Sequence, residues 1–460
     1  MSNPYKTTNL PSAMEQSDAL SSVPLTMLPP RVSRCIPSKT SLRQISFQSG
    51  QTAGPSQTSI VSLPFGSGAN FVVAGSMYLY FKLAVTQASG TYGFSGSQPS
   101  ASALINRLTI SCSSILESIQ NYNLLATNVI SPFSMSNACN LDTVASGGWG
   151  ENNSSAVSYN TSLTTNAQVN AQNTQYAFDA TGLVGYKYTL PLLSGFLNSN
   201  SEQNCIPLEL LSSPLQIQID WATITQAFFA TVAPTAYTIS ELSLVYQTVD
   251  IGRDYTDGLR QSMAGMNKFW SCPYSTIVST QTQYTSTLSY NFSVNSSSVS
   301  CVFYGVILAA NAQTLATTSK FFSASVGSTA INDAGNISRR LLADGNSVYN
   351  LALYNSDSLL VRELVRCLTN VVNPDNIRFL FNAAGNTGIT GTYRGQSYLV
   401  SFNLRCFADS SVCMAGTPVS TFNLVVSDIN TIAAGDQVTI FCCVDKIAVI
   451  DGSGAISIIN

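Results

Sequence analysis

The segment between Tyr188 and Trp221 constrains the fold more than any other. It contains two corners of the chain and ends in an alternation of apolar and polar residues. Two proline-containing apolar runs separated by a polar loop lead into residues 215–221, which read LQIQIDW. Because successive side chains of a strand point to opposite faces, only a half-buried β-strand places the apolar members of this segment on one side. The stretch predicts β architecture and contains no catalytic pattern.

Similar apolar and alternating segments recur along the chain, with Gly, Pro, Ser and Asn between them, as in antiparallel sandwiches. The predicted strands of the first half are residues 58–63, 77–85, 104–110, 215–221 and 239–246. Those of the second half are residues 285–294, 299–309, 348–354, 398–407, 421–426 and 437–449. A length of 460 residues is enough for two such units of roughly 200 residues each.

The predicted organisation has three parts. Residues 1–42 form a flexible, proline-spotted N-terminal arm, residues 43–256 the first β unit, and residues 257–460 the second. Residues 137–181 are rich in Asn, Ser, Gln and Thr and poor in apolar residues, so we expect a surface loop or tower there.

One short helix is predicted in each half. In the first, Ser114 and Glu117 have the spacing of a capping box, and Ile115, Ile119 and Tyr122 follow at helical intervals. In the second, Asp357 can cap a helix, and the side chains divide between two faces. The apolar stripe consists of Leu360, Leu364, Cys367 and Leu368, and the outward face of Arg362, Glu363 and Arg366.

Charged residues make up only 9% of the chain, the net charge is −3, and histidine is absent. Without histidine the chain lacks the commonest general base and metal ligand, so we expect no enzyme and no catalytic, cofactor or metal site. The net negative charge and the four dispersed basic residues near the arm argue against condensing a nucleic acid. These basic residues are Arg31, Arg34, Lys39 and Arg43.

The 11 cysteines are scattered and form no C-x-x-C pair. We expect most to be small buried thiols in a reducing compartment, with a disulfide or metal framework as the less favoured alternative. The polar N-terminus lacks the layout of a signal peptide, and no run of 18 apolar residues occurs. These features predict a soluble protein made inside a cell.

Asp250, Asp254 and Asp257 cluster after a predicted strand. A Ca²⁺ loop or a carboxylate pair for glycoside hydrolysis would need such closeness, but the spacing fits no EF-hand loop. We favour a solvated linker between the two units.

Several motifs in this order resemble the double jelly-roll major capsid proteins of eukaryotic double-stranded DNA viruses, in particular the polinton-like virus, adintovirus and virophage group. The resemblance is strongest over residues 45–255 and weaker in the second half, where it depends on strand order and the closing strand at 438–450. The motifs are SMYLYF at 76–81, ASALINRLTI at 101–110, LESIQNYNLL at 116–125, LPLLSG at 190–195, CIPL at 205–208 and YTISELSLVY at 237–246.

The resemblance implies an all-β chain of two consecutive eight-stranded jelly rolls, with one short helix in each and long surface loops. Three copies would form a pseudo-hexameric capsomer, and capsomers would tile an icosahedral shell around a double-stranded DNA genome. The implied partners are a homotrimer, neighbouring capsomers, and penton and minor or cement proteins, with an internal membrane left open. No direct sequence-specific nucleic-acid binding is expected, and the location is the virion, after assembly in the host cytoplasm or nucleus.

A β-sandwich adhesin or carbohydrate-binding surface protein is the alternative. Its loops could bind sugars through Asn, Asp, Trp149 or Trp221. The missing signal sequence and the unpaired cysteines argue against it.

Overall fold

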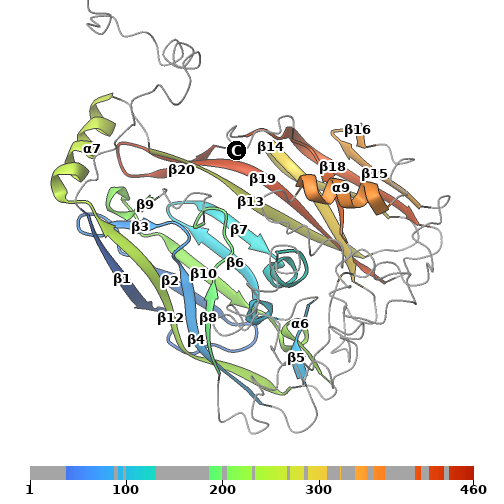
Figure 1. The fold of residues 1–460 in the computed structure, drawn as a ribbon, viewed down its shortest axis with the longest axis horizontal. Coiled ribbons are helices and arrows are strands. Elements are labelled where there is room, and N and C mark those ends of the chain that lie inside the picture. Colours follow the sequence, from blue (N-terminus) through green and yellow to red (C-terminus); the bar gives the residue numbers. More distant parts are fainter. Residues whose placement is uncertain are drawn as a thin grey trace, which may run out of the picture. The chain divides into compact units, whose positions relative to one another are not determined.

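Antiparallel strands form most of the regular structure of the chain (Figure 1). The computed structural model describes residues 38–86, 92–96, 100–130, 186–198, 205–230, 234–266, 270–283, 288–307, 322, 337–349, 357–367, 399–405, 414–428 and 435–459. The predicted tower at 137–181 and residues 1–37 of the arm lie outside these residues.

The described strands of the first half form three sheets. A six-stranded sheet has the order β8-β4-β12-β3-β9 with β1 also on β12, a four-stranded sheet has the order β2-β10-β6-β7, and β11 pairs with β5. The strands are β1 (Lys39–Ser46), β2 (Thr58–Ser62), β3 (Phe71–Val73), β4 (Tyr78–Thr86), β5 (Tyr92–Phe94), β6 (Ile105–Ser111), β7 (Ile115–Gln120), β8 (Tyr186–Pro191), β9 (Cys205–Pro207), β10 (Gln216–Trp221), β11 (Phe228–Ala230) and β12 (Ala236–Asp250).

In the second half, the strands that can be described form one eight-stranded sheet in the order β13-β19-β14-β18-β15-β16, with β17 on β14 and β20 on β19. Its strands are β13 (Trp270–Gln283), β14 (Leu288–Ile307), β15 (Ile337–Ala343), β16 (Asn346–Tyr349), β17 (Val400–Asn403), β18 (Thr417–Asp428), β19 (Gln437–Ile450) and β20 (Ile456–Ile459). The predicted strands 285–294 and 299–309 are a single strand, β14, because two bulges between Ser293 and Val299 carry the chain on along β18.

The strand predictions of the first half are confirmed to within a few residues, because its strands alternate buried and partly exposed residues as their sequences do. The alternation is complete in β10 and in most of β4. Phe81 of β4 meets Trp221 of β10 edge to face at 6.1 Å, so the six- and four-stranded sheets face each other across one core. This half is therefore a sandwich.

Strand β13 was missed by the sequence prediction although it is 14 residues long. Its buried residues are Cys272, Tyr274, Thr276 and Ser279; two of these four are polar, and Ser279 is out of step with the other three, so the apolar alternation is weak. Pro273 lies within the strand opposite Ile447 and further masks the pattern.

The helix predicted from Ser114 was wrong, because residues Ile115–Gln120 form strand β7. This strand pairs with β6 along its length and buries Leu116 and Ile119, while Ile115 is exposed. Pairing and burial thus override the local capping pattern. Helix α2 (Tyr122–Leu125) begins only after the strand and continues into a π-helical turn at Ala126–Ile130.

Other helical segments precede the second sheet. They are the 3₁₀ turns at Ala101–Leu104 and Leu208–Leu210, helix α6 (Ile224–Ala227) and helix α7 (Arg253–Met266). The solvated linker expected at residues 250–258 consists of the end of β12 and the first turns of α7, and most of its described residues are exposed. Asp250 ends β12, whereas Asp254 and Asp257 belong to α7.

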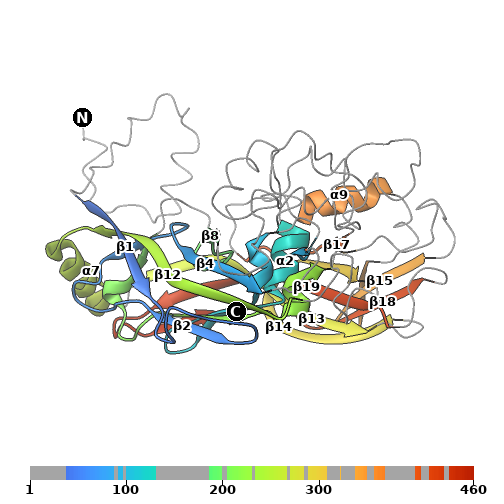
Figure 2. The same cartoon turned by 90° about the horizontal axis from the view of Figure 1, so that it is seen from below.

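The second predicted helix is confirmed as α9 (Asp357–Cys367), which contacts β17 and β14 (Figure 2). Leu364 and Cys367 are buried and Arg362 is exposed, as expected. Glu363 was expected to face outward but is buried, while Arg366 forms an ion pair with it at 2.9 Å.

The seven cysteines in the described part of the chain are free thiols, and four of them are buried. No helix among the described residues is long and apolar enough to cross a membrane.

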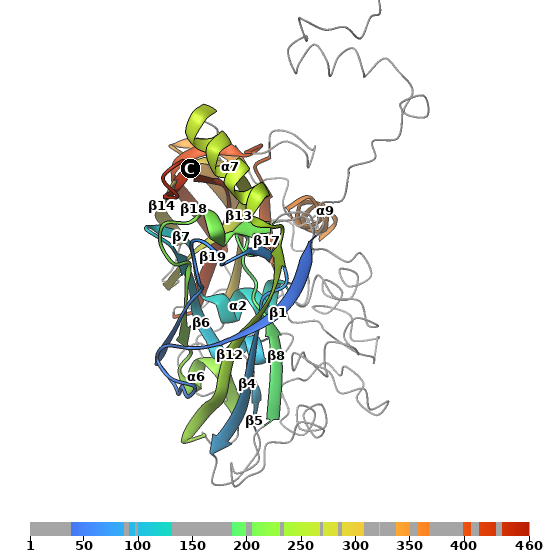
Figure 3. The same ribbon diagram turned by 90° about the vertical axis from the view of Figure 1, so that its left-hand side faces the viewer.

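Strand β1 begins within the residues assigned to the arm. It pairs with β12 in register from Lys39 opposite Asp250 to Ser46 opposite Ser243 (Figure 3). Seven of its eight residues are exposed, including Leu42 at 66%.

Candidate joint between the two sandwiches

Two edge strands meet where the halves of the chain come together. Strand β7 ends the four-stranded sheet and β13 ends the eight-stranded sheet. The hydroxyls of Tyr274 and Ser279 donate to the backbone carbonyls of Leu116 and Gln120, each at 2.7 Å. Side chains of one sheet thus satisfy the edge of the other, which removes an exposed strand edge without extending the ladder. We call β7, β13 and the turn at residues 192–198 the joint.

Glu117 is the ionisable group at the centre of the joint, and its side chain is almost fully buried. The hydroxyl of Ser194 and the backbone N–H groups of Gly195 and Phe196 donate to its carboxyl oxygens, the latter two at 3.0 and 3.3 Å. The Ser194 hydroxyl also accepts from the N–H of Leu197 at 3.0 Å. A strand residue of the four-stranded sheet therefore holds the turn that follows β8.

Burial raises the pKa of Glu117 above its ordinary value, although its hydrogen bonds oppose this shift. The same surroundings act on Lys446 of β19, whose pKa is lowered by burial while Glu117 partly offsets the effect. Burial also raises the pKa of Tyr122, whose hydroxyl accepts from the N–H of Leu193 at 2.8 Å. The joint therefore favours neutral groups.

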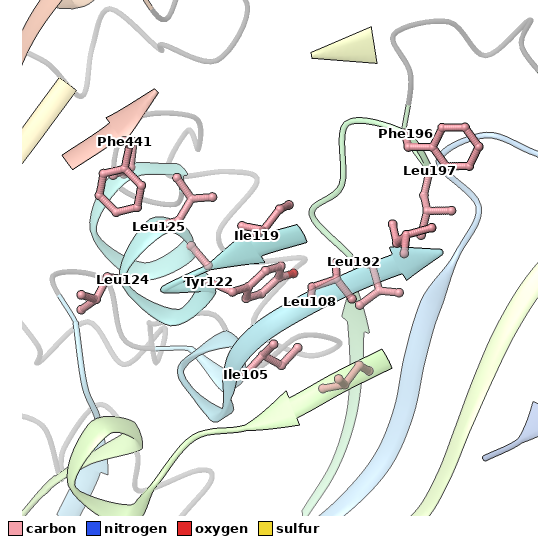
Figure 4. Packing of buried hydrophobic residues seen from close by; sticks show 14 of the residues in the cluster. Ile105, Leu108, Ile119, Tyr122, Leu124, Leu125, Leu192, Phe196, Leu197 and Phe441 are labelled. Atoms are coloured by element: carbon pink, nitrogen blue, oxygen red, sulfur yellow. The ribbon is translucent and has the colours of Figure 1, made fainter. Parts of the chain in front are cut away.

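Gly195 allows the turn to touch the second sheet. A Cβ atom on this residue would lie 1.7 Å from the backbone oxygen of Ser275, so no side chain fits between the two. The adjacent Phe196 packs edge to face on Tyr274, with ring centroids 5.4 Å apart. Figure 4 draws part of this apolar cluster, which includes Phe441 of the second half as well as residues of the first half such as Leu125.

A second contact joins the loop after β19 to the first half. The N–H of Ser212 donates to the carbonyl of Gly454 at 2.9 Å, and the hydroxyl of Ser113 to the carbonyl of Ile456 at 3.3 Å. Gly454 has a φ of +81°, and a Cβ there would lie 2.4 Å from the carbonyl oxygen of Leu210.

Helix α7 connects the halves and is tied to the first. The guanidinium of Arg260 donates to the carbonyl of Glu209 at 2.6 Å, and the hydroxyl of Thr256 donates to the Glu209 carboxylate at 3.4 Å. The N–H of Gly68 reaches the same carboxylate at 3.5 Å.

The polar groups of the joint hold the two halves of the chain together. Over the part of the chain that the structure describes, no three Cys, Asp or Glu side chains are arranged to hold a metal ion. Asp250 accepts from the N–H of Gly252 at 3.0 Å, which is an ordinary turn contact. The sequence interpretation had placed Glu117 in a helix cap and Ser194 with Gly195 in a generic corner, and so missed their contact. A single acid inside the apolar run at 115–119 was the available signal.

No protein-family model matches the sequence, and no curated protein sequence matches it. Solved structures do match the fold. The Sputnik virophage structure determined by cryo-EM aligns at a TM-score of 0.56 with 13% identity, over 100% of this chain and 94% of that one. The mavirus major capsid protein aligns at a TM-score of 0.52 with 10% identity, over 100% of this chain and 97% of that one. The Faustovirus major capsid protein aligns at a TM-score of 0.53 with 9% identity, over 95% of this chain and 94% of that one.

The chain therefore has the double jelly-roll fold of viral major capsid proteins, as predicted. Placement within the polinton-like group stays a prediction.

Proposed function

We propose that this chain is the major capsid protein of a double-stranded DNA virus, a structural protein and not an enzyme. The supporting observation is the match of the whole double jelly roll, over nearly the full length of both chains, to capsid proteins of virophages and Faustovirus. Three copies form a pseudo-hexameric capsomer, and capsomers tile an icosahedral shell.

The joint explains how the two sandwiches of one chain can enter a capsomer as one rigid unit. Two sandwiches that could rotate freely would not present a constant outline to their neighbours. Hydroxyl-to-carbonyl bonds, a buried carboxyl and a glycine contact give the two halves one arrangement. Contacts between tiles can then be weak individually, because many act together.

The surface suits self-association. With 9% charged residues, the protein presents mainly neutral hydrogen-bonding groups to its surroundings. Strand β1 is exposed along most of its length and includes the last four residues assigned to the arm, so we assign it to contacts with a neighbouring copy. The arm itself we place on the inner side of the shell, where it would clamp a neighbouring subunit or a minor protein.

Penton and cement proteins are the further expected partners, with an internal membrane as an additional option. Sequence-specific contact with the genome is not expected, since the net charge of −3 provides no general attraction for phosphate. The location is the virion, with synthesis and assembly in the host cytoplasm or nucleus.

Size-exclusion chromatography with light scattering tests the proposal. The purified chain should be a trimer, and electron micrographs should show pseudo-hexagonal particles or shells. A monodisperse monomer that binds a glycan array would contradict the proposal and favour the adhesin alternative.

A truncation tests the arm separately. Because β1 begins at Lys39, removing residues 1–37 leaves the ladder with β12 intact, whereas removing residues 1–42 deletes half of the strand. The shorter deletion should leave the melting temperature unchanged and impair shell formation. Loss of folding, or normal shells, would contradict the clamping role.

A further inference from the structure

A cavity of about 310 Å³ lies beside the joint and takes its walls from both halves of the chain. The first half contributes Ile119, Leu125 and Leu193, and the second contributes Ile277 together with three thiols. This volume falls in the range of small-molecule sites, which are mostly apolar with few polar groups.

Among the described residues that line this cavity, Arg405 is the cation. It follows β17, and its position is set by the preceding residue, because the N–H of Leu404 donates to the carbonyl of Ser300 at 2.9 Å. Arg405 is partly buried, and its own N–H contacts the Asn403 side chain at 3.4 Å. Across the residues that the structure describes, its guanidinium has neither a hydrogen bond nor an ion pair.

The other ionisable groups of the cavity do not neutralise this charge. The oxygens of Glu117 are engaged by Ser194, Gly195 and Phe196, and they form no ion pair with Arg405. A contact with Cys367 and burial hold the pKa of the Cys301 thiol well above its ordinary value, and a contact with Cys301 and burial do the same for Cys443. These thiols are therefore neutral, and a half-buried cation faces apolar walls.

We propose that this cavity binds an apolar carboxylate, such as a medium-chain fatty acid, with the carboxylate on Arg405 and the hydrocarbon chain against Ile119, Leu125, Leu193 and Ile277. Charge complementarity selects the anion, since a guanidinium hydrogen-bonds a carboxylate through two parallel N–H groups. The apolar walls select the chain.

A ligand in this position contacts both sandwiches at once. Ile119 and Leu125 belong to the first half, whereas Ile277 and Arg405 belong to the second. Binding therefore stabilises the assembled pair of sandwiches over any state in which the halves separate, and raises the unfolding temperature by mass action. Binding takes place on the isolated chain and does not require that the chain form shells.

Calorimetric titration of the full-length chain with decanoate and with uncharged decan-1-ol tests the proposal. Decanoate should bind at one site per chain, roughly 10-fold or more tightly than the alcohol, and should raise the melting temperature. Arg405→Gln should abolish this preference, so that both compounds bind equally weakly. Arg405→Lys should keep part of it.

Arg362→Gln is the matched control, since Arg362 is exposed on α9 outside the cavity, and it should retain the preference of the original chain. Ile277→Phe fills the cavity and should weaken the binding of decanoate and of decan-1-ol to a similar extent. Circular dichroism and the melting temperature without ligand verify that each variant is folded. Absence of decanoate binding to the original chain, or an unchanged preference in Arg405→Gln, would overturn the proposal.

Discussion

Glu117 in the joint and Asp220 on the first sandwich are both carboxyls that accept several hydrogen bonds, yet their pKa values shift in opposite directions. Glu117 is buried among neutral donors, and burial raises its pKa. At Asp220 partial burial also raises the pKa, but hydrogen bonds from Thr58, Gln218 and Arg107 outweigh burial, so the pKa is lowered. Arg107 lies 2.5 Å away as an ion-pair partner.

The difference shows how the surroundings of a carboxyl decide whether its neutral or its charged form is favoured. Asp220 keeps 17% of its side chain exposed and has a cation beside it, so its charge stays solvated. Glu117 has no cation among its hydrogen-bond donors, so it contributes to stability by accepting hydrogen bonds from buried donors. The joint thus depends on neutral hydrogen bonds and close packing.

Removing each carboxyl in turn should give the largest difference in stability between the two regions. Glu117→Ala leaves the Ser194 hydroxyl and two N–H groups buried without an acceptor, and should lower the free energy of unfolding by about 3–5 kcal/mol. Asp220→Ala, the matched deletion, should cost about 1 kcal/mol, because water replaces the lost acceptor. Urea denaturation at fixed protein concentration measures both. Equal costs would show that the two carboxyls contribute alike to stability.

The glycine contact comes next. Gly195→Ala places a methyl group against the Ser275 backbone and should destabilise the chain by about 1–3 kcal/mol. Gly258→Ala on α7 is the control, because nothing lies within 4 Å of its Cβ position, and it should stabilise the chain by about 0.5–1 kcal/mol. If both variants melt at the same temperature, the joint is looser than the structure shows.

The pH dependence of the two carboxyls should have opposite signs. The folded-state pKa of Glu117 is raised, so its contribution is greatest below the unfolded value of 4.5 and is lost as the pH rises through the folded value. The folded-state pKa of Asp220 is lowered, so its contribution is present above the unfolded value of 3.8 and is lost as the pH falls through the folded value.

The corresponding experiment compares the original chain with Glu117→Gln and Asp220→Asn in urea from about pH 3 to about pH 8. Glu117→Gln should gain stability relative to the original chain as the pH rises above 4.5, by at most about 1.4 kcal/mol per pH unit. Asp220→Asn should gain relative stability as the pH falls below 3.8. Parallel curves for the original chain and Glu117→Gln would show that burial does not shift this carboxyl.

The smallest effect is expected at the exposed partner of the ion pair. Arg107 is 42% exposed, and Arg107→Gln should lower the free energy of unfolding by only about 0.5–1 kcal/mol. The cost should fall further in high salt, which screens exposed charges. A cost above that of Gly195→Ala would place the more important contact on the outer face of the sandwich.

The sequence by itself determined the fold class and strands β2, β4, β6, β10 and β12 of the first half, because burial on one face imposes the alternation seen in residues 215–221. It also located helix α9, whose apolar stripe follows the helical period. These features are local, and a single window of residues contains all the information that produces them.

Only the tertiary structure decided the state of residues 114–120, the existence of β13 and the environment of Glu117. Each depends on partners far along the chain: β6 pairs with β7, β19 with β13, and the turn at 194–196 bonds Glu117. A capping pattern or a polar strand face does not reveal such partners. Pairing and burial contribute more free energy than local propensity, so the long-range contacts prevail.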